Sequence, residues 1–441
     1  MLQTMKTPGD VEWFKKDRFG LFIHWGLYAM PARHEWIKSK EKMTDEHYQR
    51  YFSRFDPDLY DPNLWAKHAA DAGMKYFVVT TKHHDGFCLW DSKLTDYKST
   101  NTPAGRDLIR PMVDAFRAAG LRAGFYHSLI DWHHPDYVID SSNHPLRDHP
   151  DRDKFNATRD QTKYQAYLHG QVRELLTEYG DIDVLWFDFS FPDKAHPDDF
   201  TKGKGHLAWD SRRLYDMIRE LAPNIILTDR LDLTDMPLSG GDIKTPEQAQ
   251  PLGWVHIDHD GRKVPVTWEA CQTFSGSWGY HRDEMNWRDT DQLLRTLIDC
   301  VSKGGNLLLN VGPTGRGEFD ARAISRLQGM GDWMKRHGRS IYGCTQAPEG
   351  ITAAPDSRLT YNPDTNRLYL HLFAWPYKHV HVPGAVGKVK YAQLLHDASE
   401  VGLGMDEWHA NQISLTGNDL TLILPQTRPD VAVPVIEMYL D

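Results

Sequence analysis

The sequence has few cysteines and no excess of positive charge. Only 4 of its 441 residues are cysteine, and Cys88, Cys271, Cys300 and Cys344 have no CxxC spacing. We therefore expect buried free thiols rather than a zinc knuckle or a redox pair. The formal net charge is −10. Because no basic stripe is available to bind phosphates, neither nucleic acid nor an anionic lipid surface is expected as a partner.

Long hydrophobic runs and phosphate-binding glycine loops are also missing. No stretch approaches the length of a membrane span, and residues 1–8 have no apolar signal-peptide region, so we expect no membrane partner and a cytoplasmic protein. Gly304 and Gly305 precede a strand pattern instead of opening a helix, which argues against a nucleotide-binding loop. No tandem repeat is visible.

The chain instead contains an alternation of buried strands and amphipathic helices. The predicted strands cover residues 19–25, 76–85, 122–128, 183–190, 224–230, 264–269 and 306–312. The predicted helices cover residues 64–72, 108–119, 171–180, 211–221, 290–302 and 321–337. This pattern is typical of a parallel sheet. An open sheet of seven strands would fit, but so many βα units favour a closed (β/α)8-like barrel with one degenerate strand.

The pattern changes after Gly343. Strand-like runs at residues 367–373, 420–425 and 432–439 are separated by turns, without helices between them. We therefore predict a catalytic barrel over residues 1–345 and an antiparallel β-sandwich domain over residues 346–441. We expect the second domain to stabilise the barrel and to border its site.

The strand predicted at 183–190 ends in a carboxylate. Because side chains two apart on a strand face the same way, Trp186 and Asp188 should share one face, with Phe187 on the other. The helix before it should end at Gly180, a residue suited to the left-handed position after a helix. An aromatic ring and an acid would then lie together at the carboxyl end of a buried strand.

In a barrel the carboxyl ends of all strands meet at one rim. The polar residues that close the runs, or lie on the loops between them, are His24, Glu35, Trp36, His83, His84, Tyr126, Asp188, Arg230 and Glu247. Two carboxylates flanking a sugar bond are the usual equipment of a glycosidase. Asp188 is the natural nucleophile and Glu247 a loop-borne acid, but Glu269 is a second candidate acid that spacing alone does not rank below Glu247.

Two other readings fit the same residues. His24, His83, His84 and Asp188 could be the ligands of a metal-dependent barrel hydrolase, although neighbours on a strand should point in opposite directions and no HExxH spacing is present. The protein could also bind carbohydrate without catalysis. Taken singly, Trp36 and Trp278 are more often core aromatics, and Arg230 fits a structural ion pair equally well.

Several short motifs together carry a family resemblance. They are FIHWG at 22–26, EW at 35–36, TKHHDGF at 81–87, LWFD at 185–188, WEAC at 268–271, SWGY at 277–280 and GNLLLNVGP at 305–313. Between about Trp13 and Tyr342 the chain resembles the α-L-fucosidases of glycoside hydrolase family 29. The resemblance implies exo-acting hydrolysis of terminal α-linked L-fucose with retention of configuration through a covalent fucosyl-enzyme.

The resemblance also implies roles for single residues. Asp188 is the nucleophile and Glu247, in KTPE at 244–247, is the general acid and base, with Glu269 the alternative for the second role. The implied lining of the fucose pocket is His24, Glu35, Trp36, His83, His84, Tyr126, Trp186, Arg230 and Trp278. The resemblance implies no metal or organic cofactor and a homo-oligomer. Many relatives have glycine after the nucleophile, whereas this chain has Phe189.

Overall fold

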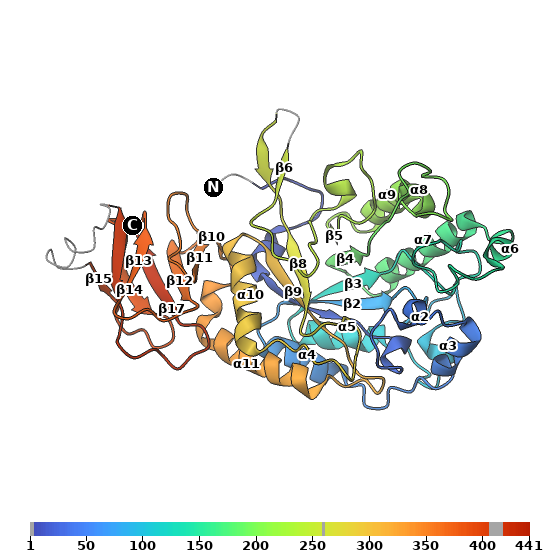
Figure 1. Ribbon diagram of the computed structural model, residues 1–441, viewed down its shortest axis with the longest axis horizontal. Coiled ribbons are helices and arrows are strands. Elements are labelled where there is room, and N and C mark those ends of the chain that lie inside the picture. The colour runs from blue at the N-terminus through green and yellow to red at the C-terminus, as the bar shows by residue number, and fades with distance from the viewer. Residues whose placement is uncertain (1–3, 258–260, 405–417) are drawn as a thin grey trace.

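The first domain is built around a curled parallel sheet of seven strands (Figure 1). The computed structural model describes residues 4–257, 261–404 and 418–441. The sheet order is β5-β4-β3-β2-β1-β9-β8. Its strands are β1 (Phe19–Ile23), β2 (Tyr76–Lys82), β3 (Arg122–His127), β4 (Val184–Phe187), β5 (Ile226–Leu227), β8 (Glu269–Thr273) and β9 (Asn306–Val311). The predicted parallel α/β architecture is confirmed.

Residues 242–247 occupy the gap between the two edge strands, β5 and β8. Ile243 forms an isolated parallel bridge with Thr228, while Lys244 and Glu247 form parallel bridges with Trp268 and Cys271. The Asp242 carboxylate holds the start of this segment, because it accepts hydrogen bonds from the backbone N–H groups of neighbouring chain segments. The segment, called the closing segment below, is therefore the degenerate eighth strand of the barrel.

Helices cover the outside of the barrel. They are α1 (Glu12–Asp17), α2 (Ile37–Lys40), α3 (Asp45–Phe52), α4 (Pro62–Asp71), α5 (Ile109–Ala118), α6 (Arg152–Asn156), α7 (Gln161–Glu178), α8 (His206–Trp209), α9 (Ser211–Leu221), α10 (Thr290–Ser302) and α11 (Ala321–His337). The predicted bounds of α9, α10 and α11 are confirmed. Asp289 and Gln292 form a capping box that fixes the start of α10. Gly180, after α7, has a φ of 71° as its predicted place requires.

The predicted strand at 264–269 is wrong in position. Lys263–Pro265 (β7) instead pairs antiparallel with Val255–Ile257 (β6) in a hairpin that projects from the barrel (Figure 1). The barrel strand β8 begins only at Glu269, where pairing with β9 starts. The apolar run was therefore divided between two elements, and Glu269 lies at the amino end of its strand, away from the rim.

Alternate residues of the strands fill the barrel interior. They form a separate buried cluster that includes Phe22, Tyr76, Tyr126, Trp186 and Cys271. Tyr76 crosses the inside at the amino end, and a Cβ atom at Gly20 would lie only 2.3 Å from its ring. Gly20 is therefore the residue that makes room for this tyrosine.

The second domain contains two antiparallel sheets that share one hydrophobic core. Its strands are β10 (Thr345–Gln346), β11 (Ser357–Asn362), β12 (Arg367–Leu372), β13 (His379–Pro383), β14 (Val389–Leu394), β15 (Gly402–Leu403), β16 (Asp419–Ile423) and β17 (Val435–Leu440). The domain packs on the side of α10 and α11 (Figure 1). Trp333 Nε1 donates to the carbonyl of Val433 at 2.8 Å across this contact.

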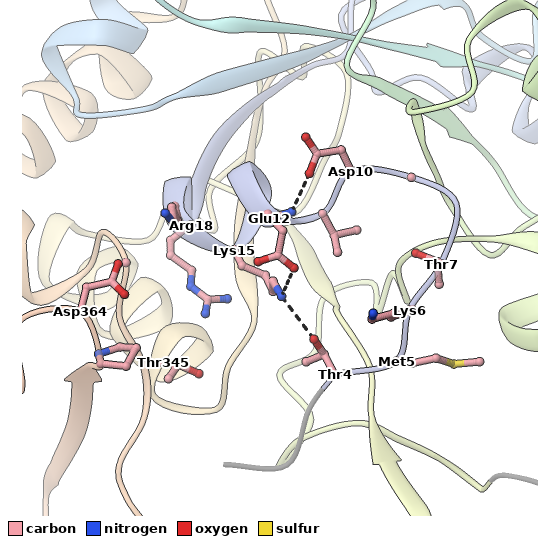
Figure 2. Close-up of a pocket in the computed structure, with 15 residues that line it drawn as sticks. Thr4, Met5, Lys6, Thr7, Asp10, Glu12, Lys15, Arg18, Thr345 and Asp364 are labelled. Atoms are coloured by element: carbon pink, nitrogen blue, oxygen red, sulfur yellow. Dashed lines mark hydrogen bonds and ion pairs between the residues drawn. The ribbon is translucent and has the colours of Figure 1, made fainter.

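A cavity of about 740 Å³ lies at the amino end of the barrel, between the N-terminal segment and the start of the second domain (Figure 2). Lys15, Glu12 and Arg18 line it, and the Lys15 ammonium is paired with Glu12 at 2.7 Å. Arg18 precedes β1, so this cavity lies at the opposite end of the strands from the predicted rim. In the part of the chain that the structure describes, no helix has the length and apolar character needed to cross a bilayer.

Candidate active site

A pocket lies at the carboxyl ends of the barrel strands. Its lining consists of Phe22, His24, Trp36, His83, Tyr126, Trp186, Asp188, Phe189, Glu247, Cys271 and Trp278. Both carboxylates predicted to act together, Asp188 and Glu247, therefore open into the same pocket. Among the described residues, none that lines this pocket comes from the second domain, so that domain's bordering of the site stays a prediction.

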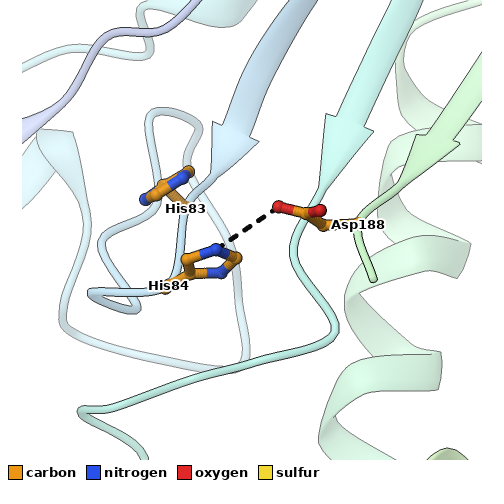
Figure 3. Close-up of side chains that lie close together, drawn as sticks. All are labelled: His83, His84 and Asp188. Carbon is orange, nitrogen blue, oxygen red and sulfur yellow. Dashed lines mark ion pairs between the residues drawn. The ribbon is translucent and has the colours of Figure 1, made fainter. Parts of the chain in front are cut away.

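Asp188 follows directly after β4 and is held from several sides. Tyr126 donates its phenolic O–H to Oδ2 at 2.7 Å, and His84 Nε2 lies 3.3 Å from the same oxygen (Figure 3). Arg230 Nη1 lies 3.7 Å from Oδ1, and the backbone N–H of Phe189 donates to Oδ1. Burial alone would raise the pKa of Asp188, but His84, Arg230 and Tyr126 outweigh burial and lower it. Asp188 is therefore an ionised carboxylate at neutral pH.

Arg230 connects the nucleophile candidate with the closing segment. Its Nε and Nη2 donate to the hydroxyl and carbonyl oxygens of Thr245, both at 2.9 Å. The guanidinium also lies 5.0 Å from the centre of the Trp186 ring, a cation–π distance. Arg230 thus fixes the position of Thr245, two residues before Glu247, while it faces Asp188.

Glu247 lies at the end of the closing segment, not on a free loop. Its pairing with Cys271 and the N–H of Gln248 donating to the Cys271 carbonyl fix the backbone there. Burial raises the pKa of Glu247, and the negative charge of Asp188 raises it further, while Arg230 and a hydrogen bond with Trp278 lower it. The net shift is upward, so this carboxyl group keeps its proton to a higher pH than an ordinary glutamate.

His24 presents one defined ring nitrogen to the pocket. Asn310 Nδ2 donates to the carbonyl of Trp278 at 2.7 Å, which assigns the other amide atom as oxygen. His24 Nδ1 lies 2.6 Å from that oxygen and must carry a proton to donate to it. Burial lowers the pKa of His24 to about 4. The neutral ring therefore has a lone pair on Nε2, which can accept a hydrogen bond from a hydroxyl.

The two adjacent histidines lie beyond the end of β2, so the prediction that they point in opposite directions is wrong. Their ring centroids are 4.1 Å apart, and His83, His84 and Asp188 bring ligand atoms within 4.8 Å of one another (Figure 3). The alternation of strand side chains no longer applies once the chain leaves the sheet. His84 Nδ1 is already engaged, 2.6 Å from Ser128 Oγ. Burial lowers the pKa of His83, so its ring is neutral.

Three predicted residues lie behind the pocket surface. Arg230 and His84 contact Asp188 from outside the lining, as described above. Glu35 is buried and accepts a hydrogen bond from the backbone N–H of Gly279 at 2.8 Å. That bond joins the loop carrying Trp36 to the loop carrying Trp278, while burial raises the pKa of Glu35.

The structure adds Phe22, Phe189 and Cys271 to the lining. Phe22, on β1, lies two residues before His24. Cys271, on β8, lies two residues after Glu269. The period-two alternation of side chains along a strand could therefore have identified both. The Phe189 ring stacks on Trp36, with centroids 6.2 Å apart and an interplanar angle of 18°. No periodicity places Phe189, because it follows the end of β4.

Glu269 is not part of the pocket lining. It is completely buried at the amino end of β8 and accepts a hydrogen bond from Tyr76. Burial raises its pKa to about 8, although the hydrogen bond from Tyr76 lowers it. Glu269 therefore cannot reach a leaving group in the pocket, and its position favours Glu247 as the acid.

The pocket combines an ionised carboxylate, a second carboxyl group of raised pKa, neutral imidazoles and aromatic walls. Such a set can attack an electrophilic carbon from one group and deliver a proton from the other. Its neutral donors and acceptors suit an uncharged polyhydroxylated ligand.

Known proteins with similar sequences and folds carry one activity in their names. A family profile described as Alpha-L-fucosidase matches residues 3–339. The plasma alpha-L-fucosidase of Homo sapiens is 30% identical over 437 residues, covering 94% of this chain and 85% of that protein. The tissue alpha-L-fucosidase of Bos taurus is 30% identical over 441 residues, covering 95% and 85%.

Solved structures agree with these sequence matches. The alpha-L-fucosidase isoenzyme 1 from Paenibacillus thiaminolyticus is 45% identical, with a TM-score of 0.89 and 98% of each chain covered. A GH29 alpha-L-fucosidase from Bacteroides thetaiotaomicron, trapped as a covalent intermediate with 2-fluoro-fucosyl fluoride, is 26% identical with a TM-score of 0.81. That comparison covers 100% of this chain and 98% of the other.

Proposed function

This chain belongs to the α-L-fucosidases of glycoside hydrolase family 29, and from that membership we propose that it removes terminal α-linked L-fucose by a retaining double displacement. Asp188 is the proposed nucleophile and Glu247 the proposed acid and base. The observation that carries this proposal is that the two carboxyl groups line one pocket with their pKa values shifted in opposite directions.

In the first step an Asp188 oxygen attacks the anomeric carbon of fucose while the bond to the leaving oxygen breaks. Glu247 gives its proton to that oxygen, so the leaving group departs neutral. The hydrogen bond from Tyr126 and the charge of Arg230 keep Asp188 ionised and oriented for attack. The step inverts the anomeric carbon and forms a covalent ester between fucose and Asp188.

In the second step water attacks the same carbon and the ester bond to Asp188 breaks. Once Asp188 is esterified its negative charge is absent, so one cause of the raised pKa of Glu247 is removed. Glu247 can then take a proton from the attacking water. The second inversion returns the α configuration and frees the Asp188 carboxylate.

The rest of the pocket suits the binding of fucose. His24 Nε2 is a hydrogen-bond acceptor, and neutral His83 lies beside it, with ring centroids 5.6 Å apart. Fucose carries a methyl group at C6, and aromatic side chains such as Phe22 and Trp278 give the pocket an apolar wall for it. A sugar that lacks or misplaces a hydroxyl would leave such buried polar groups unpaired, which disfavours its binding.

The proposal is tested with p-nitrophenyl α-L-fucoside. Wild-type enzyme should release the α-anomer of fucose first, as followed by NMR, and Asp188→Ala should lose essentially all turnover. Release of the β-anomer first would rule out the retaining mechanism. Turnover that survives in Asp188→Ala would rule out the proposed nucleophile.

The proposed acid is tested separately by azide rescue. Glu247→Ala should retain more activity on aryl fucosides with good leaving groups than on poor ones, and azide should restore part of the loss because it can attack in place of activated water. Glu269→Ala serves as the matched glutamate control. Rescue of Glu269→Ala instead of Glu247→Ala would reverse the assignment.

A further inference from the structure

The closing segment changes its pairing partner partway along its length. Its first residues bond to the chain at the end of β5, where Ile243 forms a bridge with Thr228. From Lys244 onward its backbone hydrogen bonds go to the opposite edge of the sheet, at and just before β8. Among the described residues, no backbone hydrogen bond joins residues 229–230 to residues 244–247. Side chains must therefore connect the two segments at this level.

Asp229 supplies that connection. Its Oδ1 accepts a hydrogen bond from the Thr245 hydroxyl at 2.8 Å, and its Oδ2 pairs with the Lys244 ammonium at 3.0 Å. One carboxylate thus holds two consecutive residues of the closing segment. The Asp229 side chain is 15% exposed and Thr245 is 5% exposed, so water competes little for these bonds.

The single proton of the Thr245 hydroxyl is given to Asp229, because an ionised carboxylate can only accept. The hydroxyl oxygen then offers its lone pairs to Arg230, whose Nε donates to it at 2.9 Å. Arg230 Nη2 also donates to the Thr245 carbonyl at 2.9 Å. Two bonds from one rigid, planar guanidinium fix its orientation. Asp229 therefore acts through Thr245 on the orientation of Arg230.

The Thr245 hydroxyl lies between the supports of the two proposed reacting groups. Arg230 Nη1 lies 3.7 Å from Asp188 Oδ1, on the side of the nucleophile. Thr245 precedes Glu247 by two residues in the closing segment, on the side of the acid. In retaining glycosidases the two carboxyl groups lie roughly 5–5.5 Å apart, so a small displacement of one against the other affects the reaction.

We propose that Asp229 is a positioning residue of the fucose site, acting through Thr245. It holds Arg230 against Asp188 and keeps the closing segment, with Glu247, in a fixed place beside them. This role rests on the proposed function of the pocket. Asp229 is not among the residues that line the pocket, so the role assigns it no contact with the sugar.

The experiment compares wild type, Thr245→Val and Thr245→Ser in the hydrolysis of p-nitrophenyl and phenyl α-L-fucosides between pH 4 and 8. Valine has the shape of threonine but cannot link Asp229 to Arg230, whereas serine keeps the hydroxyl. Thr245→Val should lose about fivefold in kcat/KM on the p-nitrophenyl fucoside and about fiftyfold on the phenyl fucoside, because phenolate leaves poorly without a proton from Glu247. Thr245→Ser should remain within about threefold of wild type on both.

The pH–rate profile reports on the other carboxyl group. In Thr245→Val the Arg230 guanidinium is held by one bond instead of two, so it stabilises ionised Asp188 less well and the pKa of Asp188 rises. The acidic limb should therefore move to higher pH in Thr245→Val and stay in place in Thr245→Ser. Asp229→Leu should show both changes seen in Thr245→Val, because it removes the acceptor of the same hydroxyl.

Thr267→Val is the matched control. The carbonyl of Thr267 accepts from the Lys244 N–H at 3.0 Å, so this buried threonine lies directly beside the closing segment. Its hydroxyl has no hydrogen-bond partner in the part of the chain that the structure describes. The substitution is therefore chemically the same as Thr245→Val but breaks no link, and both kinetic readouts should match wild type.

A loss of activity in Thr245→Val that is equal on both fucosides, with an unmoved acidic limb, would show a merely structural role and overturn the proposal. If Thr245→Val does not fold, Asp229→Leu is judged by the same two readouts. Wild-type hydrolysis that does not depend on Asp188 would overturn the proposed function and this inference with it. Hydrolysis that depends on Asp188 but keeps both readouts unchanged in the variants would overturn this inference alone.

Discussion

The phenolic O–H of Tyr126 donates to Asp188 Oδ2 at 2.7 Å, from the strand next to the one that carries the aspartate. Tyr126 lies on β3, in register with Trp186 on the paired strand β4, and Asp188 directly follows β4. This bond ties the proposed nucleophile to the barrel wall. It also lowers the pKa of Asp188 by stabilising the ionised form.

Replacing Tyr126 by phenylalanine should therefore weaken catalysis without removing the ring. A hydrogen bond to a charged group contributes about 1.5–3 kcal/mol, so kcat/KM should fall roughly 10- to 150-fold. Loss of the donor raises the pKa of Asp188, so the acidic limb of the pH–rate profile should move to higher pH. An unchanged acidic limb in the folded variant would show that Tyr126 does not control Asp188.

Asn310→Asp tests the tautomer of His24. A carboxylate next to Nδ1 should raise the pKa of His24 above its present value of about 4 and place a proton on Nε2. If Nε2 accepts a hydrogen bond from fucose, L-fucose should bind more weakly at pH values below the new pKa. Asn310→Ala is the control, because it also lacks the donor to the Trp278 carbonyl but adds no charge beside His24. Binding by Asn310→Asp that is as tight and as pH-independent as by Asn310→Ala would contradict the acceptor role.

Activity should be insensitive to chelators. His83, His84 and Asp188 lie close enough to share an ion, but the Arg230 guanidinium already faces Asp188 and would repel a second cation. We expect full activity after dialysis against EDTA and no metal by elemental analysis. Loss of activity that a divalent cation restores would favour the metal-dependent hydrolase instead.

The pH dependence of stability should report on Glu269. Its pKa is about 8 in the folded protein and near 4.5 when unfolded. Between these values the unfolded chain releases a proton that the folded protein keeps, so this group lowers stability as pH rises, by up to ~1.4 kcal/mol per pH unit. Denaturant unfolding of Glu269→Gln should show a flatter decline than wild type between pH 5 and 8. Identical slopes would place the folded pKa near its ordinary value.

Much of the barrel could be predicted from sequence because its signals are local. Amphipathic periodicity placed α10 at residues 290–302, and the apolar run ending at Asp188 identified β4. The positions of the strand-end residues His24, Tyr126 and Asp188 in one pocket followed from the geometry of parallel strands alone.

The closing segment and the depth of Glu269 could not be predicted in this way. Residues 242–247 form only isolated bridges and include Pro246, so no strand pattern marks them. The apolar run at 264–269 is shared between the hairpin and β8, and only long-range pairing shows where the barrel strand begins. Because β8 begins at Glu269, this carboxyl group lies at the end of the barrel opposite the pocket.

The closing segment also separates the enzyme into two parts that can change independently. Tyr126 and Trp186 lie on the paired strands β3 and β4, and Asp188 directly follows β4, whereas Glu247 ends the closing segment, which is followed by the projecting hairpin. Substitutions or insertions after Glu247 can change the surroundings of the proposed acid without altering the pairing of β3 and β4. Under the proposed function, substitutions in the chain after Glu247 should therefore change the preference for the leaving group more than the affinity for L-fucose.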